Sequence, residues 1–168
     1  QGVLSRQRRL AGKLCTFPRP PACPLLTSTA ITISLQQNLG KLLDHVRDSD
    51  VLAIVQSVEI LSRPWCLLEM VAAVDAGVPI VAIAVRGRGY DFAEATDLLL
   101  HLDTALDTVN PGACDLLRQN GVEPIDAAFK LSTTVPQIIS MPFNSSASSN
   151  AISASLLDIV ASMNTATA

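Results

Sequence analysis

The stretch Val51–Val85 constrains the fold more than any other part of this chain. It begins with a short apolar run, Val51–Val55, and ends with a second one, Val78–Val85. Such runs are typical of buried parallel strands. Between them, Trp65–Ala76 contains no glycine or proline and is rich in residues that favour helices. The sequence therefore predicts a strand–helix–strand unit, whose crossover should be right-handed.

The ends of the predicted helix carry recognisable start and stop signals. A polar turn, Gln56–Arg63, precedes it. Pro64 suits the first turn because no intrahelical donor is needed there, and Ser62 is the expected N-cap. Gly77 can adopt the left-handed conformation that commonly ends a helix. These signals predict a helix that begins near Pro64 and ends before Gly77.

Glu69 is the candidate functional residue of this helix. Trp65 precedes it by four residues and Cys66 by three, so the three side chains should share a face near the helix N-terminus. That end of the helix follows the carboxyl end of the first strand, where open α/β sheets bind ligands. The alternative is a catalytically silent carboxylate, favoured near an N-terminus by the helix dipole.

These residues resemble a motif of the TIR (Toll/interleukin-1 receptor) domain family. In that family a strand ends in a serine, a second serine precedes a Trp-Cys pair, and a glutamate follows. The resemblance is clear over Leu39–Val85 and weaker toward the C-terminus. It is carried by Ser57-x-x-x-x-Ser62-x-x-Trp65-Cys66-Leu67-Leu68-Glu69 and by Ala76-Gly77-Val78-Pro79-Ile80-Val81.

The resemblance implies a flavodoxin-like three-layer α/β sandwich. Its central parallel sheet would have the order 2-1-3-4-5 with helices on both faces, and Val51–Val55 would be strand three at the topological switch point. The resemblance also implies hydrolysis of the nicotinamide–ribose bond of NAD+, with Glu69 as the catalytic residue. Self-association would activate the enzyme in cytoplasmic signalling or defence. NAD+ would be the substrate and not a cofactor, and other TIR domains would be the partners.

One carboxylate is sufficient for this reaction. Nicotinamide attached to ribose is already cationic, so it can leave without a general acid. Ordinary glycosidases need a second carboxyl group because their leaving group must be protonated. Glu69 would hold the ribose hydroxyls and stabilise the oxocarbenium-like transition state.

The residues predicted to bind substrate lie around Glu69 or in the N-terminal segment. Several have plainer alternatives. Ser57 can cap the loop, Trp65 can pack the helix against the sheet, and Cys66 can be a small buried apolar residue or a low-pKa thiol. The predicted substrate-binding residues are Ser57, Ser62, Arg63, Trp65, Cys66 and Arg6.

The chain is expected to form a single domain with an irregular beginning. Residues 1–29 are interpreted as a degenerate N-terminal segment, and residues 30–168 as the TIR-like α/β domain. Val3-Leu4-Ser5-Arg6 resembles the first strand of the family, and a proline-rich stretch that disfavours regular structure follows. Ala30–Leu35 is β-branched and alternating, as expected for the second strand.

The remaining segments alternate between helical patterns and one further strand. Val135–Met141 is the expected last strand. Arg86-Gly87-Arg88-Gly89-Tyr90 is either a phosphate-binding loop or a flexible turn with solvated arginines. The expected helices are Leu39–Arg47, Asp91–Asp107, Ala113–Gln119, Pro124–Thr133 and Ala151–Met163.

Composition excludes several classes of protein. With 168 residues, 49% of them apolar and 16% charged, the chain can bury a substantial core and is not disordered. A net charge of −3 disfavours nucleic acid as a partner, and no apolar run reaches the roughly 18 residues of a membrane span. The 4 cysteines form no C-x-x-C pair, so we expect no metal site and a reducing compartment. Because the sequence lacks an initial Met, we expect it to be part of a longer chain.

Functions from different classes fit this sequence. The first is the NAD+ glycohydrolase, and the second is a catalytically silent TIR module that binds other TIR domains. A third is a flavodoxin-like receiver domain. It is disfavoured because a receiver needs acidic residues at the ends of its first and third strands, where Ser5 and Ser57 stand.

Overall fold

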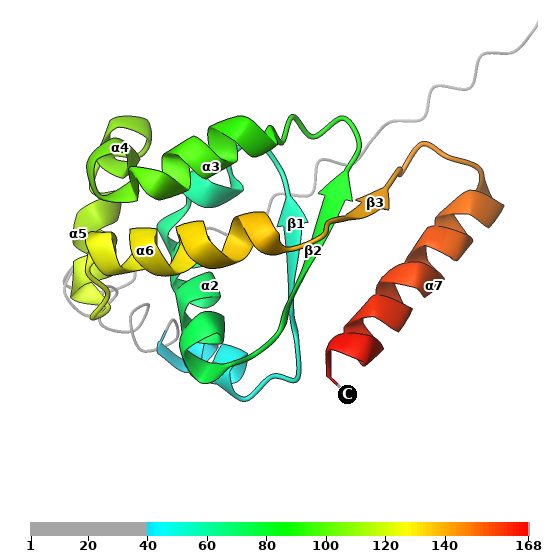
Figure 1. The fold of residues 1–168 in the computed structure, drawn as a ribbon, viewed down its shortest axis with the longest axis horizontal. Helices are drawn as coiled ribbons and strands as arrows, with labels where there is room; N and C mark the ends of the chain where they lie inside the picture. The colour runs from blue at the N-terminus through cyan, green and yellow to red at the C-terminus, as the bar shows by residue number, and fades with distance from the viewer. Residues whose placement is uncertain (1–39, 168) are drawn as a thin grey trace, which may run out of the picture.

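The computed structural model describes residues 40–167, in which strands and helices alternate around a parallel sheet (Figure 1). The sheet contains β1 (Leu52–Gln56), β2 (Ile80–Val85) and β3 (Met141–Phe143), in the order β1-β2-β3. Both neighbouring pairs are parallel. The predicted α/β class with a parallel sheet is therefore confirmed.

The observed strand order agrees with the part of the predicted order that the described residues cover. In the predicted order 2-1-3-4-5, strands three, four and five lie side by side, as β1, β2 and β3 do. Gln56 of β1 lies opposite Ala84 of β2, which lies opposite Pro142 of β3. The predicted strands one and two, Val3–Ser5 and Ala30–Leu35, lie outside the described residues.

The predicted connection between the first two described strands is α2 (Pro64–Ala76). Pro64 occupies the first turn, and Gly77 ends the helix with a φ of 70°, as expected for a left-handed terminator. The helix is apolar on most sides because neighbours cover it on most sides. Its buried side chains are Leu67, Leu68, Met70, Val71, Ala72 and Ala73.

The predicted N-cap of α2 is wrong. Arg63 occupies the N-cap position and makes no side-chain capping bond. Ser62 instead ends a short 3-10 turn, η1 (Ile60–Ser62), and its hydroxyl donates to the carbonyl of Glu59 at 2.9 Å. The local turn therefore uses the hydroxyl that sequence reasoning assigns to the helix start.

One predicted helix, Asp91–Asp107, is two helices in the structure, α3 (Phe92–Leu100) and α4 (Leu102–Val109). The chain bends at His101, whose φ of −115° and ψ of 26° are not helical. Both helices pack on α6, so the bend lets each bury leucines against the same neighbour. These leucines are Leu99, Leu102 and Leu106. The apolar spacing continues across the bend, which therefore leaves no signal in the sequence pattern.

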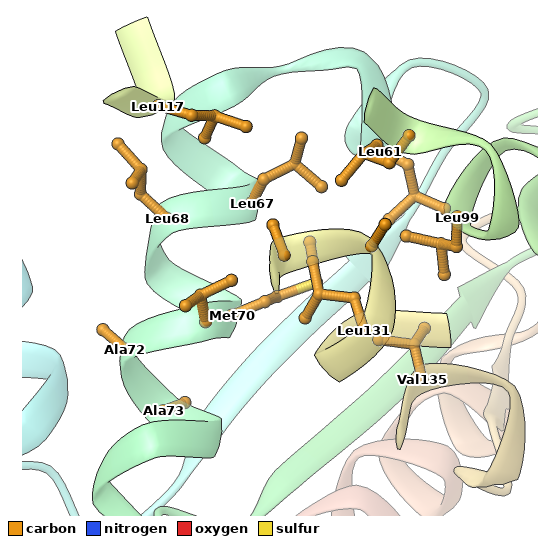
Figure 2. Packing of buried hydrophobic residues seen from close by; sticks show 14 of the residues in the cluster. Leu61, Leu67, Leu68, Met70, Ala72, Ala73, Leu99, Leu117, Leu131 and Val135 are labelled. Atoms are coloured by element: carbon orange, nitrogen blue, oxygen red, sulfur yellow. The ribbon is translucent and has the colours of Figure 1, made fainter. Parts of the chain in front are cut away.

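At the centre of the helical layer lies α6 (Pro124–Thr134), which packs against α2, α3, α4 and α5 (Ala113–Gln119). Both α5 and α6 confirm the predicted helices, with α6 one residue longer. In Figure 2, the side chains of Leu67 and Met70 point from α2 toward Leu131 of α6. Leu131 is completely buried, so it joins the two helices in one core.

The last strand begins later than the predicted Val135–Met141. The chain first forms a 3-10 turn, η2 (Val135–Gln137), because Val135 is buried in the helical core and holds the chain there. β3 then begins at Met141. Among the described strands β3 pairs with β2 alone, and such an edge position tolerates Pro142, which has no backbone N–H.

The helix α7 (Ser149–Ala166) lies on the opposite side of the sheet from α2 and α6 (Figure 1) and packs on β2 and β3. Successive side chains of β2 point alternately to these two faces of the sheet. Ala82 belongs to the main core, whereas Val81 is buried outside it. The helix extends beyond the predicted Ala151–Met163, and Ser148 caps its start. Helices therefore cover both faces of the sheet.

The predicted helix before β1 is present over residues 40–47. Leu43 and Val46 are buried, whereas Asp44 and Arg47 form an exposed ion pair at 2.8 Å. This division confirms an amphipathic helix. Within residues 40–167, no helix is long and apolar enough to cross a membrane.

The central position of α6 predicts a strong difference between two substitutions on that helix. Leu131→Ala should lower the free energy of unfolding by about 2–5 kcal/mol, because Leu131 is fully buried and its truncation leaves a cavity. Ile125→Ala should change it by only about 0.5 kcal/mol, because Ile125 is 62% exposed. Urea unfolding followed by circular dichroism measures both. Equal losses would contradict this packing of α6.

Candidate functional site

The carboxyl ends of β1 and β2 lie at one edge of the sheet because the two strands are parallel. The loop after β1 leads into η1 and α2, and the loop after β2 leads into α3. A hydrogen bond from the Val58 N–H to the Arg88 carbonyl, at 3.0 Å, joins the two loops. The sheet thus brings together two segments that are far apart in the sequence, at the edge where ligands are expected.

Glu69 lies on this side of the fold, in the N-terminal half of α2, and its side chain is half-buried. Burial raises the pKa of the Glu69 carboxyl, because removing a carboxylate from water disfavours its charged form. Within residues 40–167, Glu69 makes no ion pair that would offset this effect. Glu69 is therefore less solvated than a surface glutamate.

The predicted neighbours of Glu69 on α2 are also half-buried. Trp65 and Cys66 both pack against the main core, which supports the structural role proposed for Trp65. Burial raises the pKa of the Cys66 thiol, the nearby Glu69 carboxylate raises it further, and Arg63 acts in the opposite direction. A raised pKa disfavours the reactive thiolate and favours a small buried apolar residue.

The other predicted site residues are distributed around the loop after β1. Ser57 is half-buried, and its carbonyl accepts the N–H of Ile60 at 3.2 Å, so it takes part in the turn. Arg63 is exposed and pairs with Glu59 at 3.2 Å. Arg6 lies outside the described residues. The structure thus places Ser57, Ser62 and Arg63 in the segment that leads from β1 into α2, whereas Glu69 lies within the helix.

A cavity of about 320 Å³ opens between η1 and α3. We call it the acidic pocket, because the described residues that line it, within 40–167, include three carboxylates and no Lys, Arg or His. Of the predicted site residues, it includes only Ser62. The lining residues that matter most for its chemistry are Glu59, Leu61, Tyr90, Asp91, Glu94 and Leu98.

Sequence reasoning missed this pocket. Asp91 followed by Glu94 does carry a local signal, because an acidic N-cap with Glu three residues later marks the start of a helix. In the structure Asp91 caps α3 by accepting the N–H groups of Ala93 and Glu94, at 2.8 and 3.0 Å. That signal shows where α3 begins. It does not show that Glu59 lies on the same cavity, because only the sheet brings the two loops together.

The glycine loop Arg86–Tyr90 lines a second, shallower cavity of about 220 Å³. Gly87 and Gly89 have φ of 79° and 67°, a conformation that favours glycine. Arg86 lines the cavity, Arg88 is exposed, and the ring of Tyr90 packs edge-on against Phe92 at 5.1 Å. Both earlier interpretations, phosphate loop and solvated turn, remain compatible with this geometry.

Gln56 is a polar residue that sequence reasoning placed in the turn and the structure places at the end of β1. Its side chain is 2% exposed, and its Oε1 atom has no hydrogen-bond partner among the described residues. Burial raises the pKa of the Tyr90 hydroxyl, and the Gln56 side chain beside it partly offsets that rise. The Gln56 side chain and the Tyr90 hydroxyl therefore lie close together at the carboxyl ends of the strands.

Neither of these two cavities is lined by Trp65, Cys66 or Glu69. In the same part of the chain, no three His, Cys, Asp or Glu side chains gather in a way that could hold a metal ion. Comparison with known proteins finds no matching family model, no matching curated protein and no matching solved structure. The TIR resemblance thus remains a prediction from the sequence motif.

The raised pKa of Glu69 predicts that Glu69→Gln stabilises the protein at neutral pH. The folded state binds the Glu69 proton more tightly than the unfolded state, so stability is lost as the pH rises from about 4.3, the ordinary value for Glu, through the folded-state pKa. The glutamine variant lacks this loss and should have the higher free energy of unfolding at pH 7, with the gap closing toward pH 4.

Urea unfolding at several pH values measures the effect of Glu69→Gln. Glu123→Gln is the matched control, because Glu123 is 62% exposed and forms only a surface ion pair with Arg118. A destabilised Glu69→Gln variant at pH 7 would show that the ionised carboxylate makes a favourable interaction in the folded protein.

Proposed function

We propose that this chain is a TIR-type NAD+ glycohydrolase in which Glu69 is the catalytic residue. The observation that carries the proposal is the half-buried carboxylate of Glu69 on α2, the helix that follows the parallel strand β1 and the turn η1. It stands in the motif Ser57-x-x-x-x-Ser62-x-x-Trp65-Cys66-x-x-Glu69. The described strand order, β1-β2-β3, is compatible with the second half of a flavodoxin-like sheet.

The proposed reaction uses Glu69 in its ionised form. Nicotinamide leaves as a neutral molecule, and water then adds to the ribose carbon and loses a proton, which gives ADP-ribose. As the bond between ribose and nicotinamide breaks, positive charge develops on the ribose ring. A carboxylate removed from water interacts more strongly with that charge than a solvated one does. Partial burial of Glu69 would therefore strengthen its interaction with the transition state, although it disfavours the ionised form of the carboxylate in the resting protein.

Self-association, the proposed means of activation, is supported by apolar side chains that remain exposed. On α7 only Ile159 is buried, whereas Leu156, Leu157 and Val160 are 49%, 70% and 51% exposed. Phe129 on α6 is 72% exposed. Where exposed apolar side chains form a large contiguous patch, the patch often marks a protein interface. Other copies of the domain, in a cytoplasmic signalling or defence setting, are the partners we propose.

The same exposed residues favour the second candidate function, a TIR interaction module without turnover. In that case α7 would bind other TIR domains, and Glu69 would have no catalytic role. The two candidates differ in one measurable property, the release of nicotinamide, so one experiment separates them.

The purified protein should release nicotinamide from NAD+ when assembly is promoted by high protein concentration and a crowding agent. Glu69→Ala should reduce the rate at least about 100-fold, which is typical for loss of a group that stabilises transition-state charge. Nicotinamide release is measured by chromatography. The matched control is Asp75→Asn on the same helix, because Asp75 is 49% exposed and pairs with Lys130 at the surface.

Three outcomes are informative. Release that disappears only in Glu69→Ala supports the hydrolase. Absence of release from all variants, with circular dichroism showing an α/β protein, favours the interaction module. Release that persists in Glu69→Ala shows that another group performs the chemistry and rejects the role proposed for Glu69.

A further inference from the structure

The acidic pocket is separate from Glu69 and has a chemical character of its own. Its volume, about 320 Å³, lies within the range of small-molecule sites. Two hydrogen bonds hold its walls in place. Asn110 donates to the carbonyl of Ser62 at 2.8 Å, and the Val58 N–H donates to the carbonyl of Arg88 at 3.0 Å. These bonds join segments that are far apart in the sequence and that line the cavity.

The carboxylates of the acidic pocket come from two different segments. Asp91 is the N-cap of α3 and Glu94 lies in its first turn, where the helix dipole favours negative charge. Glu59 precedes η1, which is only a short 3-10 turn, so no α-helix dipole accounts for its negative charge. Its partner, Arg63, is largely exposed, and an exposed ion pair of this kind contributes little. A ligand cation can therefore replace Arg63 as the partner of Glu59 with little loss of free energy.

Of the three carboxylates that line the acidic pocket, Glu94 makes the fewest interactions with described residues. Among the described residues it forms no ion pair, and no hydrogen bond to its carboxylate is present. Asp91, by contrast, accepts two backbone N–H groups through Oδ1. Glu94 thus contributes to the pocket lining a negative charge that no described residue pairs.

The interior of the acidic pocket is apolar and aromatic. Leu61 is 4% exposed and Ala95 is 9% exposed, and Leu98 packs against the same core. Tyr90 is half-buried and contributes an aromatic wall. Aromatic rings attract cations, and apolar side chains favour the carbon skeleton of a ligand. Carboxylates repel phosphate groups, so the lining disfavours a dinucleotide.

We propose that the acidic pocket binds a small organic cation, namely a protonated amine, amidine or guanidine on a compact apolar or aromatic body. The cationic group would lie between Glu59 and Glu94, and the apolar body would contact Leu61, Tyr90 and Leu98. This proposal does not depend on the proposed hydrolase, because Glu69 does not line the pocket.

Benzamidinium is a suitable probe because it combines an amidinium group with a flat apolar ring. Titration of the whole chain, followed by two-dimensional amide NMR, should give saturable shifts at Tyr90, Ala95 and Leu98 with a dissociation constant near 1 mM. Benzamide, which is neutral and has nearly the same shape, should bind at least about fivefold more weakly, because it lacks the charge. Added salt should weaken benzamidinium and leave benzamide unchanged.

Variants identify the carboxylates involved. Glu94→Gln and Glu59→Gln should each weaken benzamidinium about five- to tenfold. Glu123→Gln, which removes a charge near the start of α6, should leave binding unchanged because Glu123 is outside the pocket. Glu69→Gln should also leave it unchanged, which keeps this result distinct from the test of the hydrolase.

The proposal fails if benzamidinium produces no saturable shift at these residues up to about 50 mM. It also fails if benzamide binds equally well, or if the shifts map to another surface. Unchanged affinity in both Glu94→Gln and Glu59→Gln, with unaltered amide spectra showing intact folds, would likewise reject the acidic pocket as a cation site.

Discussion

The parallel pairing of β1 with β2, made possible by the buried helix α2, is the constraint on which the rest of the described structure depends. Two consecutive parallel strands need a crossover, and this one buries apolar side chains on most of its surface. The apolar side chains of α2 that do not face the sheet are covered by the helices α5 and α6, which pack against α2. The same pairing sends two loops to one edge of the sheet, which creates the acidic pocket.

A tightly covered helix also explains the properties of Glu69. Most neighbouring positions on α2 are apolar and buried, so a carboxylate placed among them loses solvation. Among residues 40–167 no cation pairs with it to restore the balance. The raised pKa predicts that ionised Glu69 lowers the free energy of unfolding at neutral pH, and a chemical role for the carboxylate would explain why it stands there. The carboxylates of the acidic pocket differ from Glu69 in solvation, because they remain largely exposed to water.

Local signals in the sequence were sufficient to predict the bounds of elements whose ends depend on nearby residues alone. Pro64 and Gly77 mark the ends of α2, and Pro124 marks the start of α6. Such signals failed where distant packing decides. His101 interrupts a continuous helical pattern so that α3 and α4 can both pack on α6. Val135 stays with the helical core, so β3 begins only at Met141.

For the candidate site, the sequence by itself determined that Trp65, Cys66 and Glu69 follow a buried strand on one helix, because strand and helix periodicities are local properties. Only the tertiary structure decided how solvated Glu69 is, and that Ser62 ends a 3-10 turn instead of capping α2. It also placed Glu59 and Glu94 on one cavity. Desolvation and cavity shape depend on segments distant in the chain, and their positions are set by strand pairing and core packing, which no local pattern encodes.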